Sequence, residues 1–449
     1  MTQRQIISSI ANRLATVLLL LLISGCTSKP SALAESSIFT SDIDNFWVAF
    51  DKVNSTEDSL QQLQFLKELF IDKGTPGLAA MMEAKNYSAE EYQYVILHYP
   101  KFWNSIRQHT QQATDNRAAL ALGIEKLAQL YPDLAPANIY FTIGALRSNG
   151  TTLDSMVLIG SELAFANAET ITEEFPDYLS HLRSYFNTVP GQHLVFLNIH
   201  EYVHTQQKTT IGYNLLAQTV IEGAAEFIAE KALNIASPNP QISFGRNNEE
   251  RIREAFAPEM FSPNFNNWLW NSPDNEFGMR DLAYYVGYDI CRHYYEAAAD
   301  KSLAIRQMIE LDYNKEEDLI QFVEQSGYFQ QPILPYKASF EKSRPIVERV
   351  SPMVEGDQGI DLDVTEITIH FDQEMDDRYR GFDFGPLGED NVVRITRILG
   401  FAEDRKSLRV EIEPLEPNKR YQVVFTSRFV NAAGIPLQPF LLDFKTGVQ

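Results

Sequence analysis

The sequence predicts a multidomain chain in which a mainly helical α+β domain with a small sheet is followed by an all-β sandwich. Between residue 42 and about residue 130, apolar residues recur every three or four positions, which is the helical period. Around residues 139–159, and again from residue 345 onward, apolar residues alternate with polar ones, as is typical of strands. With 449 residues, 44% of them apolar, the chain can bury more than one core.

The N-terminus has the pattern of a secretory signal. Arg4 and Arg13 precede the apolar run 15–23, and small residues lead from this run to Cys26. The run is too short for a transmembrane helix, which needs about 20 apolar residues. With Cys26 at its end, the segment resembles a bacterial lipoprotein signal, although an ordinary signal followed by an unrelated cysteine is the alternative. The resemblance implies removal of residues 1–25 and a membrane anchor through a lipidated Cys26.

Residues 26–40 are expected to form a tether that holds the first domain away from the membrane. Thr27 and Ser28 lack the acidic residue that, by analogy with many two-membrane bacteria, signals retention in the inner membrane, so an outer-membrane location is favoured. The formal charge of −22 argues against nucleic-acid binding. Cys291 has no partner in the mature chain, which excludes an intramolecular disulfide framework and favours a core position.

Residues 41–342 are expected to form the first domain, with the aromatic residues of its early helices in the core. Two strands, at residues 139–143 and 156–159, are expected to be joined by a glycine-containing loop at 144–152. The second strand either lies inside the sheet or binds an extended substrate by main-chain pairing. Residues 237–263 contain four prolines and are expected to form a long loop.

His200, Glu201 and His204 form an H-E-x-x-H motif. Residues four apart lie on one face of a helix, so both imidazoles can bind a single metal ion. Glu201 would lie beside that ion, where a base can take a proton from metal-bound water. Because catalytic zinc usually has three protein ligands, a third ligand is required.

A second helical segment at residues 214–233 carries Glu222 and Glu226, four positions apart, with small residues between them. Small residues would let this helix approach the first closely enough for a carboxylate to reach the ion. Alone, such a pair is more often solvated surface charge, but the neighbouring H-E-x-x-H favours a functional role. Spacing does not decide between the two carboxylates; we assign the third ligand to Glu222 and treat Glu226 as a supporting residue or the alternative ligand.

Tyr284, Tyr285 and Tyr288 stand close together in a later helical segment. A neutral hydrogen-bond donor near the metal could stabilise the oxyanion of a tetrahedral intermediate, and a tyrosine hydroxyl is suited to this role. For any one of the three, packing in the helix core is an equally good interpretation.

Residues 343–449 are expected to form the sandwich, without a disulfide. Their acidic residues lack the ligand spacing of a calcium loop, so a solvated face is the better interpretation. The alternating strands are expected around residues 367–371, 408–412, 421–425 and 442–444.

Three stretches together resemble the predicted zinc-dependent peptidases related to gliding-motility lipoprotein B. They are H-E-Y-V-H-T-Q-Q from His200, E-G-A-A-E from Glu222 and Y-Y-V-G-Y from Tyr284, and the resemblance covers about residues 40–335. In the wider gluzincin class the third ligand is a glutamate about 18–20 positions after the second histidine, and an acidic residue four positions later orients a histidine. Glu222 and Glu226 match these roles in order, except that thermolysin-like enzymes have aspartate in the second. Residues 343–449 are similar to bacterial Ig-like domains.

The resemblance implies a zincin-like metallopeptidase domain followed by an Ig-like domain that serves in spacing or adhesion. The expected function is hydrolysis of a peptide or protein substrate by a lipid-anchored enzyme that uses Zn²⁺, with Glu201 as general base. Contact with a cell-surface protein or glycan through the Ig-like domain is also expected. The alternatives are a non-catalytic cell-surface scaffold built on a peptidase fold, and a hydrolase of cell-wall peptide cross-links or another amide.

Overall fold

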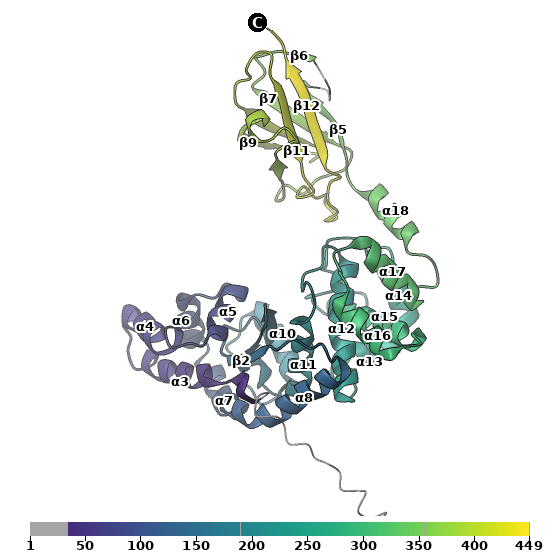
Figure 1. Cartoon of the computed structure of the whole chain (residues 1–449). Helices are drawn as coiled ribbons and strands as arrows, with labels where there is room; N and C mark the ends of the chain where they lie inside the picture. The colour runs from purple at the N-terminus through teal and green to yellow at the C-terminus, as the bar shows by residue number, and fades with distance from the viewer. Residues whose placement is uncertain (1–34, 189, 354–355, 357, 449) are drawn as a thin grey trace, which may run out of the picture. The chain divides into compact units, whose positions relative to one another are not determined.

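The computed structural model of the chain describes residues 35–188, 190–353, 356 and 358–448 (Figure 1). The expected signal, Cys26 and most of the expected tether lie outside these residues. By internal packing, the chain divides into two compact units, residues 1–205 and 206–449, and the division falls inside the region 41–342 expected as one domain. Within the described ranges, no helix is both long and apolar enough to cross a membrane.

The first unit begins with helices that pack around aromatic side chains, which confirms the predicted core. Phe46, Trp47 and Phe50 are buried against Trp103, at ring-centroid distances of 4.8, 6.1 and 6.5 Å. The buried indole of Trp103 keeps a hydrogen bond, because its N–H donates to the carbonyl of Val95 at 3.0 Å. These helical segments are α3 (Ser41–Val53), α4 (Ser59–Leu66), the π-helical η1 (Lys67–Ile71), α5 (Pro76–Lys85), α6 (Ala89–His98), α7 (Pro100–Gln111), η2 (Gln112–Asn116) and α8 (Arg117–Leu130).

A four-stranded mixed sheet follows, with strand order β1-β2-β4-β3. Strands β1 (Ile38–Phe39) and β4 (Met156–Gly160) are parallel to β2 (Asn138–Thr142), whereas β3 (Gly150–Leu153) is antiparallel to β4. Two details differ from expectation: β1 lies within the region expected as a tether, and the region expected as a loop contains β3. The rest of the unit consists of α9 (Ser161–Ala164), η3 (Asp177–Leu179), α10 (Ser180–Phe186), η4 (Pro190–His193) and α11 (Leu194–His204).

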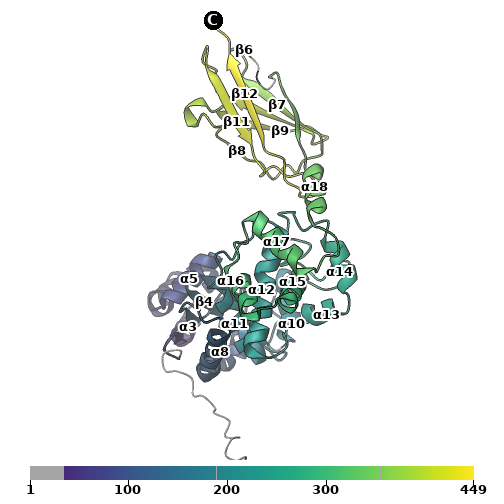
Figure 2. The same ribbon diagram turned by 45° about the vertical axis from the view of Figure 1, so that its right-hand side comes forward.

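The helical part of the second unit is built on two helices, α12 (Leu215–Leu233) and α15 (Ala283–Ala297), which lie side by side (Figure 2). A side-chain carbon added at Gly223 of α12 would lie 1.9 Å from the carbonyl carbon of Gly287 in α15, so the two backbones are in direct contact. The region expected as a long loop contains two short helices, α13 (Pro240–Arg246) and α14 (Glu249–Phe256). The later helices are α16 (Lys301–Glu310), α17 (Glu316–Ser326) and α18 (Leu334–Ser343).

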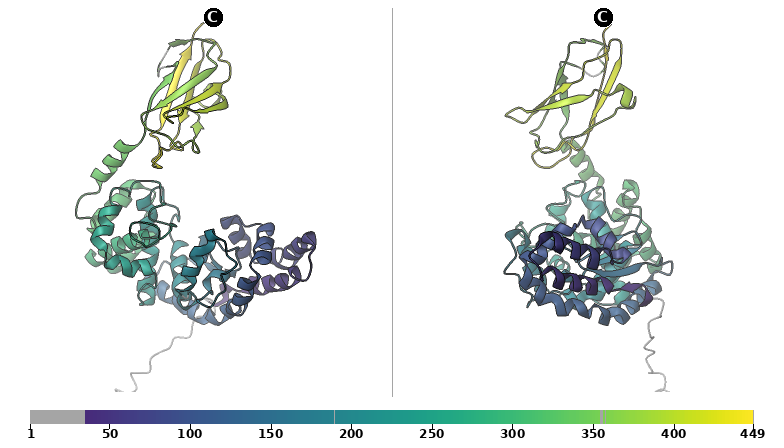
Figure 3. Two further views of the ribbon diagram at one scale, coloured as in Figure 1. Left: turned by 180° about the vertical axis from the view of Figure 1, so that it is seen from behind. Right: turned by 90° about the vertical axis from the view of Figure 1, so that its left-hand side faces the viewer.

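The C-terminal region of the second unit is β-rich, as predicted (Figure 3). Its two four-stranded sheets have the orders β5-β7-β10-β9 and β6-β12-β11-β8. Residues from both sheets, including Ile369, Val410, Val423 and Phe444, form one hydrophobic core, so the sheets make a sandwich. The elements are β5 (Val347–Ser351), β6 (Gln358–Ile360), β7 (Glu366–Phe371), β8 (Phe382–Asp383), η5 (Glu389–Asn391), β9 (Ile395–Phe401), β10 (Ser407–Ile412), β11 (Arg420–Phe425) and β12 (Phe440–Thr446).

Candidate metal centre

Helix α11 carries the whole H-E-x-x-H motif in the first unit. The helix packs against α8 and against strands β3 and β4. Gly123 of α8 allows a close approach, because a side-chain carbon added there would lie 3.1 Å from Ile199. At the other end of the contact, the hydroxyl of Tyr202 accepts a hydrogen bond of 2.8 Å from the backbone N–H of Ala137, just before β2. Buried contacts therefore fix both the position and the rotation of α11.

His200 and His204 lie on one face of α11, and both are buried. Their Nε2 atoms are 3.1 Å apart, and the ring planes are inclined at 79°. Two nitrogens that bind one tetrahedral zinc at about 2.0–2.1 Å would lie about 3.3 Å apart. The separation of the histidine pair is thus that of a hydrogen bond between the two rings and is also close to the spacing of two ligands of one zinc.

Glu201 is buried against the edge of the sheet. A side-chain carbon added at Gly150, the first residue of β3, would lie 3.0 Å from Oε1 of Glu201 and 3.2 Å from its Cγ. Any larger residue at position 150 would push on this carboxylate. Gly150 is thus the residue that lets strand β3 pass directly beside Glu201.

Strand β3, and not β4, forms the sheet edge next to the motif. Strand β4 lies between β2 and β3, which settles the two interpretations of residues 156–159 in favour of the sheet interior. Among the described strands, β3 pairs only with β4, and all of its residues are partly exposed. A partner strand could pair with the remaining edge of β3.

Glu222 lies on α12 in the second unit and is also buried. Asn214 caps this helix by accepting a hydrogen bond of 2.9 Å from the N–H of Ala217. One turn before Glu222, the side-chain amide of Gln218 donates to Oε1 of Glu222 at 3.0 Å. The other end of Gln218 accepts a bond of 2.8 Å from the N–H of Gly212. Gln218 therefore orients the Glu222 carboxylate and connects it to the preceding loop.

Glu226 lies one turn further along α12 and is fully buried. Its Oε1 accepts a hydrogen bond from the hydroxyl of Ser237 and another, at 2.9 Å, from the side-chain amide of Asn239. The two candidate carboxylates thus differ in their surroundings. Ser237 and Asn239, which bind Glu226, belong to the loop that follows α12, whereas Gln218, which binds Glu222, lies on α12 itself.

Tyr284, Tyr285 and Tyr288 all lie on α15 in the second unit. The hydroxyl of Tyr288 donates to Oε1 of Glu230 at 2.8 Å, and that of Tyr285 donates to Oδ2 of Asp289 at 3.4 Å. Burial, followed by the neighbouring carboxylate, raises the pKa of both phenols, so both remain protonated at neutral pH. Tyr284 is only partly buried.

Three residues that support the predicted site were not anticipated from the sequence. Gln218 stands four positions before Glu222, and side chains at this spacing meet on a helix. The hydrogen bond between them could therefore be predicted from the sequence. Gly150 and Glu162 carried no such local signal. Glu162, fully buried after β4, accepts hydrogen bonds from the N–H groups of Gly144 at 2.8 Å and Leu146 at 3.2 Å and so holds the loop that leads into β3.

Comparisons with known proteins identify no family for this chain. No family model matches it, and no curated protein matches it. One similar solved structure is that of surface layer protein SbsC, domains 1-6, at 13% identity and a TM-score of 0.18. The match covers 83% of this chain and 46% of that chain, so the chain spans about half the length of the matched structure. A TM-score this low does not indicate a common fold.

Proposed function

We propose that the protein is a zinc-dependent metallopeptidase of the gluzincin type, with a zincin-like catalytic region and a bacterial Ig-like sandwich at its C-terminus. The observation that carries the proposal is the distance of 3.1 Å between the Nε2 atoms of His200 and His204. Two buried imidazoles at this distance suit a shared cation, and the glutamate between them in sequence lies at a sheet edge where a substrate could bind. Zinc is the metal that two histidines and a carboxylate most often bind in a hydrolase.

In the proposed ligand set, His200 and His204 are joined by Glu222. Each of these residues is buried and offers one ligand atom, a histidine nitrogen or a carboxylate oxygen, of a type that binds metal ions. Gln218 supports the assignment, because its hydrogen bond to Oε1 of Glu222 orients the carboxylate. Glu226 is proposed as a supporting residue, since Ser237 and Asn239 already bind its Oε1.

Glu201 acts as the general base in this proposal. A zinc ion in the site would supply Lewis acidity, which brings the pKa of a bound water close to neutrality. Glu201 takes a proton from the attacking water and later gives it to the leaving amine. Gly150 leaves room for the carboxylate against β3, so the proton acceptor lies beside the edge that would bind the substrate.

Strand β3 would bind an extended peptide by adding it to the sheet as a further strand. Tyr284, Tyr285 or Tyr288 of α15 would supply the neutral hydrogen-bond donor that stabilises the oxyanion. The hydroxyls of Tyr285 and Tyr288 already donate to Asp289 and Glu230, respectively, and would have to leave these partners to act as donors.

The cellular setting is proposed from the sequence. Lipidation of Cys26 would anchor the protein in the cell envelope, with the outer membrane favoured, and the substrate would be a peptide or a protein exposed there. The sandwich would contribute spacing or contact with a surface protein or glycan.

The test compares zinc content and peptide cleavage for the purified chain and for Glu201→Gln. We expect wild-type protein to bind about one zinc and to cleave a peptide library in a chelator-sensitive manner. Glu201→Gln should keep the zinc but lose about 10²–10⁴-fold or more in kcat, because the general base is gone and the ligands remain.

Glu90→Gln is the matched control, because Glu90 is an exposed glutamate in the first turn of α6, and its replacement should leave kcat unchanged. Normal cleavage by Glu201→Gln would rule out the mechanism. Zinc binding without cleavage of any peptide by the wild-type chain would instead favour the non-catalytic scaffold.

A further inference from the structure

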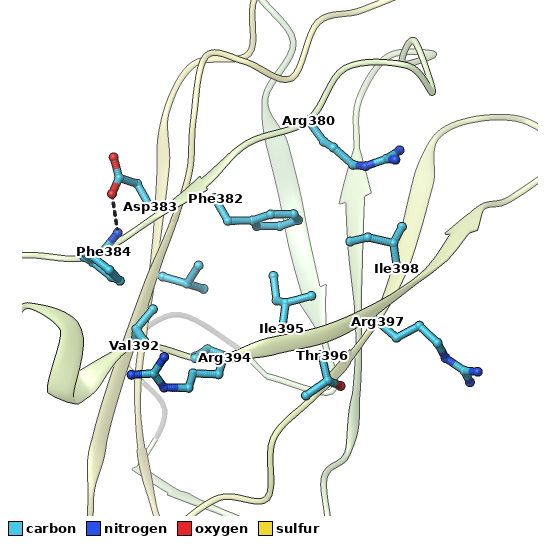
Figure 4. A pocket seen from close by; sticks show the side chains of 12 residues that line it. Arg380, Phe382, Asp383, Phe384, Val392, Arg394, Ile395, Thr396, Arg397 and Ile398 are labelled. Atoms are coloured by element: carbon cyan, nitrogen blue, oxygen red, sulfur yellow. Dashed lines mark hydrogen bonds between the residues drawn. The ribbon is translucent and has the colours of Figure 1, made fainter.

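The β-rich region contains a groove of about 470 Å³ that is separate from the H-E-x-x-H motif (Figure 4). It lies between β9, the last strand of one sheet, and β8, the last strand of the other. We call it the β8–β9 groove and define it by the side chains used below, namely Arg380, Phe382, Arg394, Ile395, Arg397 and Ile398.

The floor of the groove is apolar. Phe382, Ile395 and Ile398 are half-buried and pack against the core of the sandwich. Their remaining surface faces the groove, where Phe382 and Ile395 point into the same space (Figure 4). The side chain of Phe384, also in the lining, is 51% exposed. An apolar surface that connects the core to solvent in this way is suited to binding apolar side chains of a partner.

Basic residues outnumber acidic ones in the lining of the groove, although the chain as a whole carries −22. Arg380, Arg394 and Arg397 line it together with one acidic residue, Asp383. Arg397 forms an ion pair with Glu411, and Arg394 pairs with Glu389 at 3.2 Å and with Glu413 at 4.0 Å. These pairs are exposed and contribute at most about 1 kcal/mol each, so a carboxylate of a ligand can replace them.

One edge of β9 remains available for strand pairing. In the sheet order β5-β7-β10-β9, this strand pairs with β10 among the strands that the structure describes. An edge strand presents main-chain N–H and C=O groups to a further strand. A second copy of β9 is a poor partner, because it would bring a further Arg394 and Arg397 to a groove that three arginines already line. An acidic strand has the complementary charge.

We propose that the β8–β9 groove binds an extended acidic segment of another protein, which pairs with the edge of β9. Apolar side chains at alternate positions of the segment enter the space beside Phe382, Ile395 and Ile398. The intervening carboxylates meet Arg380, Arg394 and Arg397. Main-chain hydrogen bonds supply affinity, while the apolar floor and the arginines of the lining select the sequence.

The probe is a fluorescein-labelled peptide in which valine and glutamate alternate, titrated with the purified full chain and followed by fluorescence anisotropy. We expect saturable binding that weakens as salt is added. The double variant Arg394→Glu/Arg397→Glu should lose about tenfold or more in affinity, since two favourable contacts become repulsive. Arg349→Glu is the matched control: Arg349 is exposed on β5, at the opposite edge of the same sheet, and its replacement should change affinity by less than about twofold.

Two further probes test the strand mode and the apolar floor. The same peptide methylated at alternate backbone nitrogens, and a polyglutamate of equal length, should both bind at least about tenfold more weakly than the alternating peptide. The proposal would be overturned if either probe bound as tightly as the alternating peptide, or if Arg349→Glu lost as much affinity as the double variant. Failure of the alternating peptide to bind, or a preference for an acidic polysaccharide over the peptide, would also overturn it. Unchanged thermal unfolding of the variants would show that the sandwich remains folded.

Discussion

At the scale of single residues, Glu162 is a carboxyl whose burial changes how it titrates. The carboxyl is fully buried, and this burial raises its pKa from 4.5 to about 7 despite hydrogen bonds from Gly144 and Leu146. The folded state therefore holds this proton more tightly than the unfolded chain does. Protonated Glu162 contributes about 3 kcal/mol to the free energy of unfolding. This contribution is complete below pH 4.5 and is lost as pH rises through about 7.

Glu162→Gln tests this assignment, because glutamine has a similar shape and does not ionise. Between pH 5 and pH 8, the free energy of unfolding of the wild type should fall relative to that of the variant by about 2–3 kcal/mol, measured by urea denaturation. Glu90→Gln, at an exposed site, should follow the wild type at every pH. A constant difference between the wild type and Glu162→Gln across this range would show that Glu162 does not titrate there.

Residue spacing predicted the positions of the candidate ligands on their helices better than it predicted the residues around them. His200 and His204 stand four apart in sequence, and their Nε2 atoms do meet. The same spacing placed Glu222 and Glu226 on one helix but could not reveal that Ser237 and Asn239 bind Glu226. Contacts between residues far apart in the chain, such as that of Gly150 with Glu201, leave no trace in local sequence.

At the scale of elements, strong periodicity predicted the early helices and the sandwich strands, but short polar elements were missed. Strand β3 reads Gly-Thr-Thr-Leu and has no apolar alternation, so it was expected to be part of a loop. Helix α13 begins with Pro240, and a proline is typical of loops but is also favoured in the first turn of a helix. Strand β3 is extended because it pairs with β4, and the periodicity of a sequence contains no information about such pairing.

The contact between α12 and α15 makes a sharp prediction for Gly223. An added methyl group would lie 1.9 Å from the carbonyl carbon of Gly287 and 2.2 Å from the backbone nitrogen of Tyr288, so no side-chain rotation can relieve the clash. We expect Gly223→Ala to lower the free energy of unfolding by about 3 kcal/mol, measured by urea denaturation, because the helices must separate.

Gly191→Ala is the control for this substitution. A methyl group at position 191 would lie 3.6 Å from the nearest atom, the carbonyl oxygen of Ala164, which is an ordinary contact. Its effect should stay within about 0.5 kcal/mol. A similarly small effect of Gly223→Ala would mean that the two backbones are not in contact.

At the scale of the whole molecule, a ligand set that spans separate helices should couple metal binding to folding. A metal that binds the folded chain and not the unfolded chain adds about 2.7 kcal/mol of stability at a hundredfold excess over its Kd. The β-rich region has a hydrophobic core of its own and contains none of the proposed ligands. We therefore expect zinc to raise the unfolding temperature of the helical part by about 5 °C or more and to leave that of the sandwich unchanged.

Differential scanning calorimetry of the full chain, with zinc and with a chelator, measures both transitions. Glu222→Ala should abolish the zinc-dependent shift because it removes a ligand. Glu226→Ala should lower the unfolding temperature in both conditions yet keep the shift, since it leaves Ser237 and Asn239 without their acceptor. The reverse pattern would identify Glu226, and not Glu222, as the third metal ligand. A zinc shift that survives both substitutions would exclude this helix from the ligand set and leave the histidine pair to bind the metal with another partner.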